Sequence, residues 1–339
     1  MKKILLIVFL VLLLAGIYCA WAIFGPTVSA PENKFFYIKT GSTYADVKNG
    51  LKNQGIISGT FFFDKLSKQV KYDKNIKTGK YEIRNGMSLV DMIRMLKSGR
   101  QSPVRFVINK LRTKEDLAGK IGQQFEVDSL QVINFITNND SLLKYKLDTN
   151  SVMTIIIPNS YLFWWNASLN NILTRFADQK QKFWEGKRTA KAAALNLTPD
   201  EVYTMASIVE EETIKPEDKG KIASVYMNRM NKGMKLEADP TVKYAMRNFG
   251  LKRILHGHLQ YPSLYNTYQH NGLPPGPIAT PSINTIDAVL DAPKTDYIFF
   301  VAKPDFNGYS NFASSYGEHL VNAKAYQHAL DSLIISRTK

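Results

Sequence analysis

The chain has 339 residues, of which 45% are hydrophobic and 22% charged, a balance typical of folded protein rather than of disordered segments. Its 44 Lys and Arg against 29 Asp and Glu give a net charge of +15, which favours an anionic partner. The basic residues are scattered and no nucleic-acid-binding motif accompanies them, so we expect no nucleic-acid partner. One cysteine, Cys19, excludes an intramolecular disulfide within these residues.

The first apolar segment, residues 4–24, carries no charge and follows Lys2 and Lys3. At a rise of about 1.5 Å per residue, a helix of this length crosses a hydrocarbon core of about 30 Å. A cleaved signal peptide is the alternative, but its apolar core is normally about 7–15 residues long. Because Trp21 suits an interfacial anchor and basic residues favour the cytoplasmic side, we predict a cytoplasmic tail (1–3) and an uncleaved single-pass anchor. The bulk of the chain would then lie outside the cytoplasm, which is the periplasm when the membrane is the inner membrane of a two-membrane envelope. ATP- or NAD-dependent chemistry is not expected there.

A short linker at 25–34 precedes a small module that contains two similar segments. In each, a hydroxyl residue is followed three positions later by an aspartate, as Thr43 with Asp46 and Ser88 with Asp91. This pattern is typical of helix starts. With strand-like residues between the two segments, it predicts an α+β module at 35–101. Small modules of this kind resemble LysM domains, which bind N-acetylglucosamine polymers; glycan binding and a purely structural spacer remain open alternatives.

A helix is strongly indicated after residue 198. Thr198 can cap its first turn, Pro199 suits the first helical position and Glu201 completes a capping box. Apolar residues follow at helical spacing and predict a buried stripe on one side of the helix. The stripe is made of Val202, Met205, Ala206 and Val209.

Three consecutive glutamates end this helix, and their angular positions distinguish them. At about 100° per residue, Glu211 points away from the apolar stripe into solvent, whereas Glu210 and Glu212 flank the stripe. Glu212 also stacks on Ile208 and Val209, so partial desolvation would raise its pKa and suit it to hold a proton near neutral pH. Glu210 remains the alternative, because geometry alone favours Glu212 only slightly.

The downstream sequence is rich in polar and rigid segments. A second helix is predicted at 216–230, and a short helical stretch begins at Asp239. The segment 272–278 contains three prolines and two glycines, which predicts a stiff loop near the aromatic and amide residues at 265–268. Such a loop could border a sugar-binding cleft or be a structural turn.

These motifs together resemble the MltG/YceG family of membrane-bound endolytic murein transglycosylases. The similarity covers nearly the whole chain and rests on the segments 206–213, 228–230, 233–234, 239–242, 265–268 and 272–278. It implies an α+β fold: an N-terminal transmembrane helix, the LysM-like module, and a larger mixed catalytic domain (102–339) with a helical core around the catalytic glutamate. The second glutamate of the family motif falls on Glu212. Other motif positions expected to line or brace the cleft are Glu210, Asn228, Asp239, Thr241, Tyr265, Asn266 and Thr267.

The resemblance implies non-hydrolytic cleavage of the MurNAc–GlcNAc β-1,4 bond, which leaves a 1,6-anhydro-MurNAc end and terminates or trims nascent glycan strands. It implies no cofactor, and its partners would be peptidoglycan strands, the membrane and peptidoglycan synthases. No metal site is expected, because His256 and His258 lack further ligands at suitable spacing. The sequence departs from the family pattern at Glu237 and at Leu320, after His319. A hydrolytic muramidase using Asp239, or a non-catalytic peptidoglycan-binding scaffold, is the alternative.

Overall fold

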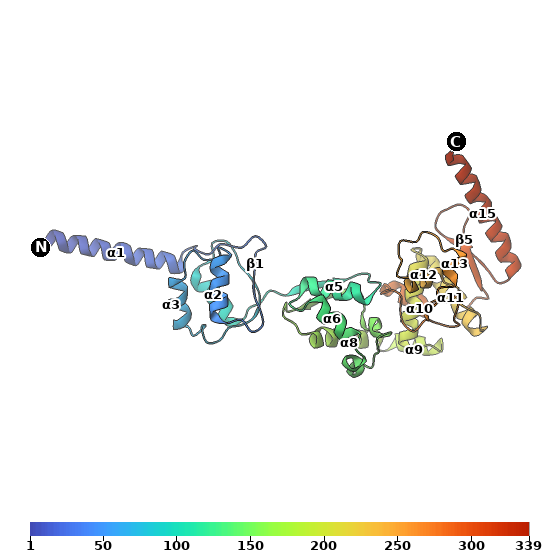
Figure 1. The fold of residues 1–339 in the computed structure, drawn as a ribbon, viewed down its shortest axis with the longest axis horizontal. Helices are drawn as coiled ribbons and strands as arrows, with labels where there is room; N and C mark the ends of the chain where they lie inside the picture. The colour runs from blue at the N-terminus through green and yellow to red at the C-terminus, as the bar shows by residue number, and fades with distance from the viewer. Residues whose placement is uncertain (339) are drawn as a thin grey trace. The chain divides into compact units, whose positions relative to one another are not determined.

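The computed structural model describes residues 1–338, which form two compact units (Figure 1). The first unit comprises Met1–Phe106, Gln124–Val127 and Tyr161–Ser168, and the second comprises the rest of the described chain. Helices predominate, and the described strands form three two-stranded sheets, in which β1 pairs with β2, β3 with β4 and β5 with β6. The predicted α+β class with an apolar N-terminal helix is therefore confirmed.

The first unit begins with α1 (Lys2–Phe24), which among the described residues is the one helix long and apolar enough to cross a membrane. The other elements up to the start of the second unit are β1 (Phe35–Ile38), α2 (Tyr44–Asn53), α3 (Phe61–Gln69), β2 (Gly79–Glu82), α4 (Leu89–Ser98) and β3 (Val104–Ile108). β1 and β2 are antiparallel, with Phe35 opposite Glu82 and Ile38 opposite Gly79.

The caps of the small module form as the sequence indicates. Thr43 and Asp46 make a reciprocal capping box at the start of α2, and the Ser88 hydroxyl accepts a hydrogen bond from the Asp91 backbone N–H at the start of α4. The segment after α1 is packed onto the module, because Val28 is only 2% exposed and forms a β-bridge with Met87. This short connection therefore contributes to the core of the first unit.

The second unit contains most of the helices. Its first half is formed by α5 (Lys114–Gln124), α6 (Ser129–Ile136), α7 (Asn139–Leu142), the 3₁₀ turns Leu143–Tyr145 and Val152–Ile155, α8 (Leu169–Trp184) and α9 (Lys187–Ala194). Its second half is formed by α10 (Pro199–Glu212), α11 (Pro216–Asn231), α12 (Asp239–Ala245), α13 (His256–Leu259), α14 (Ile283–Leu290), β5 (Phe299–Ala302), β6 (Ser310–Ala313) and α15 (Tyr316–Thr338). β4 (Asn159–Phe163) begins in this unit and ends in the first.

Helix α10 is the central helix of the second unit. Thr198 and Glu201 form the predicted capping box, and α10 packs against α9, α11, α12 and α14. Every residue from 202 to 209 is buried, so the prediction of a single buried stripe was too narrow. The polar side chains on the other faces find partners: the Tyr203 hydroxyl donates to the Ile156 carbonyl at 2.6 Å, and the Ser207 hydroxyl accepts from the Ile278 N–H at 3.0 Å. The last turn of α10 is thus held in a fixed frame.

Candidate active site

The three glutamates at the end of α10 diverge into three different environments. Glu212 is the last residue of the helix, and the next residue, Thr213, has an extended backbone. Glu212 is half-buried and faces a pocket, whereas Glu210 and Glu211 are each bound by basic residues. The sequence repeats one residue type three times, but the fold gives each copy a different environment.

The Glu212 carboxyl has one neutral hydrogen-bond donor beside it. The Tyr226 hydroxyl, which lies on α11 and is 1% exposed, donates to Glu212 Oε1 at 2.8 Å. Desolvation raises the pKa of Glu212 to about 7, against the lowering effect of the Tyr226 hydrogen bond and with a further contribution from the negative charge of Asp239. A carboxyl with this pKa holds its proton in a large fraction of molecules at neutral pH, as a general acid requires.

Glu212 opens onto a pocket of about 290 Å³ in the second unit. The pocket combines acidic, basic and aromatic side chains, a mixture that can bind hydroxyls by hydrogen bonds and sugar rings by stacking. Its lining residues are Glu212, Arg229, Leu236, Glu237, Asp239, Tyr268, Phe299, Phe300 and His319.

Glu210 is held as an ion by a dense set of donors. Its Oε2 accepts from Lys219 Nζ at 3.0 Å, from the Ser282 hydroxyl at 3.0 Å, and from the Thr285 hydroxyl. Burial alone would raise the pKa of Glu210, but the hydrogen bonds from Thr285 and Lys219 and the Lys219 charge outweigh burial and lower the pKa. Glu210 therefore braces α10 against α11 and the start of α14.

Glu211 does not face solvent, contrary to the angular prediction. Its side chain is 16% exposed and forms ion pairs with Lys110 at 2.6 Å and Arg112 at 3.2 Å. The prediction was wrong because a segment about a hundred residues earlier in the chain covers this face of α10. That segment is also bound through Thr280, whose hydroxyl accepts from the Leu111 N–H at 2.8 Å.

Among the other predicted site residues, Asp239 lies in the pocket with Glu212. It is exposed at the start of α12, and its Oδ1 accepts from the Tyr268 hydroxyl at 2.7 Å. Thr241 and Thr267 lie behind this wall: both are buried, their hydroxyls are 2.9 Å apart, and the Thr267 hydroxyl also accepts from the Ala238 N–H at 3.0 Å. The two threonines thus fix the backbone that carries Asp239.

Asn228, Tyr265 and Asn266 lie outside the pocket lining. The Asn228 amide donates to the backbone carbonyls of Thr295 and Tyr297, at 2.7 and 2.9 Å. The Asn266 amide donates to the carbonyls of Leu259, at the end of α13, and of Tyr261, and the Tyr265 ring packs 4.8 Å from the ring of Tyr244. The stiff 272–278 loop likewise packs inward, with Ile278 1% exposed. These residues hold the loops that surround the pocket.

The structure adds pocket residues that the sequence interpretation had not selected. The Arg229 guanidinium donates to the Ile298 carbonyl at 2.7 Å and pairs with Glu237 at 2.9 Å. The His319 ring stacks on Phe299, with ring centroids 4.9 Å apart, and desolvation and the nearby Arg229 charge lower the pKa of His319. Glu237 has a left-handed backbone, with φ of 53°, which is uncommon for a residue other than glycine. A charged residue on a buried helix face was the signal available for Arg229.

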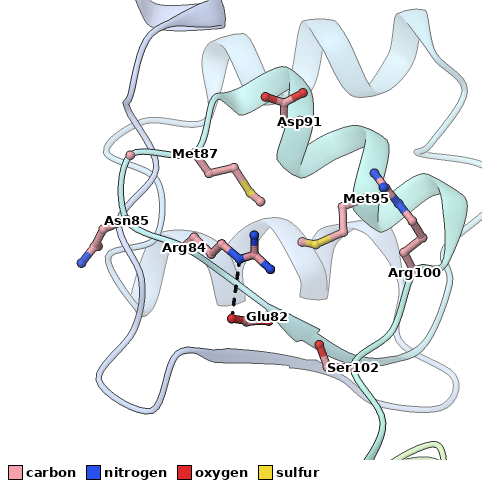
Figure 2. A pocket seen from close by; sticks show the side chains of 9 residues that line it. Glu82, Arg84, Asn85, Met87, Asp91, Met95, Arg100 and Ser102 are labelled. Atoms are coloured by element: carbon pink, nitrogen blue, oxygen red, sulfur yellow. Dashed lines mark ion pairs between the residues drawn. The ribbon is translucent and has the colours of Figure 1, made fainter.

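A second, larger cavity of about 580 Å³ belongs to the first unit and is separate from the Glu212 pocket. Figure 2 shows Met87 and Met95 extending toward each other, with Arg84 beside them and paired with Glu82 at 3.6 Å. Asp91 on the rim is bound by Ser88 and Arg94. The cavity therefore offers no carboxyl comparable to Glu212.

No group of three or more His, Cys, Asp or Glu among residues 1–338 is arranged to hold a metal ion.

The known proteins that this chain resembles in sequence carry the same name. The chain is 45% identical over 118 residues to an endolytic murein transglycosylase of Bacillus subtilis (strain 168), a match that covers 35% of this chain and 32% of that protein. It is 26% identical over 336 residues to an endolytic murein transglycosylase of Streptococcus pneumoniae (serotype 2, strain D39), covering 87% of this chain and 60% of the relative. The chain thus spans less than two thirds of the length of either relative.

A solved structure shares the fold. The crystal structure of a YceG-like protein from Listeria monocytogenes aligns with a TM-score of 0.56 and 27% identity, covering 84% of this chain and 97% of that one. The model of the YceG-like family matches residues 36–325, which include all the residues that line the Glu212 pocket. The chain belongs to the YceG-like family.

Proposed function

We propose that this chain is an endolytic lytic transglycosylase of peptidoglycan, with Glu212 as its acid and base. It would cleave the MurNAc–GlcNAc β-1,4 bond without water, leave a 1,6-anhydro-MurNAc end, and so terminate or trim nascent strands. The relatives named endolytic murein transglycosylase support the reaction class. The observation that carries the proposal is the Glu212 carboxyl, with its pKa raised to about 7 and its position at the edge of a polar and aromatic pocket.

One carboxyl suffices for both proton transfers. Protonated Glu212 gives its proton to the glycosidic oxygen as the bond to MurNAc C1 breaks. The resulting carboxylate takes the proton from the MurNAc C6 hydroxyl, whose oxygen bonds to C1 and closes the anhydro ring. Glu212 is then protonated again, so atoms and charge balance without water. Because Tyr226 holds Oε1, Oε2 is the oxygen that would face the sugar.

Neighbouring groups in the pocket can support the positive charge that develops at C1. Asp239 lines the same pocket as Glu212, whereas Glu237 lines it as the ion-pair partner of Arg229, at 2.9 Å. The negative charge of Asp239 would stabilise an oxocarbenium-like state, as preorganised charges do in other enzymes. Phe299 and Tyr268 offer flat faces and a hydroxyl for the sugar rings.

The proposal includes attachment of the chain to a membrane through α1. We assign α1 as an uncleaved single-pass inner-membrane anchor with the bulk of the chain in the periplasm. The contact of the α1 end with the module supports an anchor that is retained, since Ala22 is 9% exposed and accepts a hydrogen bond from the Thr27 hydroxyl. We also propose that 35–101 is a LysM-like module, that 102–339 is the catalytic region, and that glycan strands and peptidoglycan synthases are partners.

A hydrolytic muramidase is the second candidate, because a second carboxylate lies in the pocket. Asp239 is exposed there and could activate a water or act as a nucleophile, as the second carboxylate of two-carboxylate glycosidases does. The two reactions differ in their products: hydrolysis adds one water to each cut and leaves a reducing end, whereas the transglycosylase leaves an anhydro end.

The test uses the full chain in detergent with purified sacculi as substrate. Soluble products are weighed by mass spectrometry for the wild type, for Glu212→Gln, for Asp239→Asn and for Glu185→Gln. Glu185 is an exposed glutamate directly after α8 and serves as a control for loss of one negative charge.

We expect anhydro products from the wild type and the Glu185 variant, and about a hundredfold less product or lower still from Glu212→Gln. Products with a reducing end that vanish in Asp239→Asn would establish the muramidase instead. If Glu212→Gln released as much product as the wild type, the carboxyl would not be the catalyst and the proposal would fail.

A further inference from the structure

The end of α1 is fastened to the small module by several contacts. The Gly25 N–H donates to the Trp21 carbonyl at 2.8 Å, so the chain leaves the helix in a defined direction. Immediately afterwards, Val28 and the 86–87 backbone exchange hydrogen bonds of 3.2 and 3.0 Å. With so few residues between helix and bridge, the orientation of the module is fixed relative to the end of α1.

Aromatic side chains of the module continue the aromatic end of α1. The ring of Phe62, in the first turn of α3, lies 6.2 Å from the ring of Tyr18, which in turn lies 6.5 Å from the ring of Trp21. Phe61 packs edge-on against Phe62 at 5.2 Å, yet 64% of Phe61 remains exposed. A large phenylalanine this exposed, beside the end of an apolar helix, forms an apolar patch that water would solvate poorly.

The depth of this patch follows from the helix. In a spanning helix, Tyr and Trp near one end lie at the level of the lipid head groups. Because Phe62 contacts Tyr18, Phe61 and Phe62 reach the same level when α1 is in a bilayer. We propose that the first turn of α3 docks into the membrane surface and inserts Phe61 about 5–10 Å into the boundary between head groups and acyl chains, as amphipathic surface helices do.

The charge of the module fits an anionic lipid surface as the occupant. Residues 25–101 carry 14 Lys and Arg against 6 Asp and Glu, so more than half of the net charge of the chain lies beside the anchor. Lys65 lies one turn after Phe61, with its ammonium 5.9 Å from the Phe61 ring, and Lys68 is exposed a further turn along α3. Such lysines keep their ammonium groups at the phosphate level while their stems cover apolar surface.

The test measures the depth of single labels on the full chain. Cys19→Ala removes the native thiol, and one cysteine is then introduced by Phe61→Cys, Lys39→Cys or Leu12→Cys and labelled with bimane before reconstitution. Lys39 is exposed just beyond the end of the β1–β2 ladder that lies away from the α1 connection, and Leu12 is in the middle of α1. Vesicles of phosphatidylethanolamine and phosphatidylglycerol carry a shallow doxyl-labelled lipid, and aqueous iodide is the second quencher.

We expect the label at residue 61 to lose most of its fluorescence to the doxyl lipid and little to iodide. The label at Lys39 should show the reverse, and the label at Leu12 should confirm that α1 is in the bilayer. A Lys65→Cys label reports on the same turn if the Phe61 variant folds poorly. Quenching at residue 61 by iodide as strong as at Lys39 would overturn the proposal while leaving the anchor intact. Protection of residue 61 from both quenchers would also overturn it, because a protein surface would then cover the patch.

Discussion

The two sides of the last turn of α10 carry the same residue type in opposite electrostatic environments. On one side Glu210 receives hydrogen bonds from Lys219, Ser282 and Thr285, and its pKa is lowered. On the other, Glu212 receives one from the neutral Tyr226 hydroxyl, and its pKa is raised to about 7. Both carboxyls are partly buried, so burial alone does not decide which is ionised. The number and charge of the hydrogen-bond donors around each carboxyl determine which one is ionised.

The difference also separates stability from chemistry. A carboxylate that accepts hydrogen bonds from several donors, one of them a lysine ammonium, is costly to protonate. A carboxyl with one neutral donor and an open pocket holds its proton cheaply and can release it. We therefore expect the Glu210 side to provide stability and the Glu212 side to provide catalysis.

The largest effect should come from Glu212→Gln. Glutamine keeps the shape of the side chain but cannot exchange a proton, so the rate of product release from sacculi should fall by about 10²–10⁴-fold, the usual contribution of a general acid and base. The measurement is the initial rate of soluble product release. Glu185→Gln, which removes an exposed charge, should leave the rate unchanged. A Glu212 variant with a rate near that of the wild type would show that the Glu212 side does not provide catalysis.

Glu210→Gln should act on stability. It leaves the Lys219 ammonium, which is 11% exposed, without its carboxylate, and breaking such a pair costs about 3 kcal/mol. Urea unfolding of the second unit should show a lower midpoint. The double variant Glu210→Gln with Lys219→Met removes the uncompensated charge and should recover part of the loss. If the single variant unfolded like the wild type, Glu210 would not be the brace that its contacts indicate.

The pH dependence of stability should distinguish the two sides next. The pKa of Glu212 in the folded chain, about 7, exceeds its ordinary value of 4.5, so its contribution favours folding below about pH 4.5 and is lost as pH rises through 7. Glu212→Gln should therefore be more stable than the wild type at pH 8, by on the order of 1–3 kcal/mol, and nearly equal to it at pH 4.5. The readout is the unfolding midpoint at each pH. A difference that did not vary with pH would show that Glu212 is not held neutral.

The sequence could predict what depends on neighbours along the chain. The capping box at Thr198 and Glu201 and the flanking position of Glu212 follow from residues within two turns of helix. The sequence could not predict that α10 is buried all round, because its cover comes from α9, α11, α12 and α14. Local angles likewise misplaced Glu211, whose partner Lys110 lies about a hundred residues earlier.

The environment of the candidate site could not be predicted from residues that are close in the sequence. The donors that fix Glu210 include Thr285, 75 residues later in the chain, and the aromatic wall of the Glu212 pocket includes Phe299. The angular argument left Glu210 and Glu212 nearly equivalent. Their pKa values differ because residues distant in the sequence surround each carboxyl differently. His319, more than a hundred residues after Glu212, had no local pattern that marked it as a pocket residue.

The smallest effect on the rate should come from Tyr226→Phe. This variant tests most directly whether a hydrogen-bond donor sets the pKa of Glu212. The Tyr226 hydroxyl stabilises the ionised form of Glu212, so its loss should raise the pKa of Glu212 further. The decline of kcat/KM on the alkaline side should then move to higher pH, because the acid form persists longer. The rate at the optimum should fall by about tenfold or less, since one neutral hydrogen bond contributes about 0.5–1.5 kcal/mol.

A purely structural Tyr226 would behave differently. The ring of Tyr226 packs 6.1 Å from that of Phe300, and phenylalanine preserves this contact, so a structural role predicts an unchanged pH profile. A shift of the alkaline limb to lower pH would mean that the hydroxyl favours protonated Glu212. The contrast with Glu210 would then be one of solvent access rather than of donors. A shift to higher pH with little loss of rate would show that a single donor tunes the proton affinity of the catalytic carboxyl, on the flank of α10 opposite the one where three donors hold Glu210 as an ion.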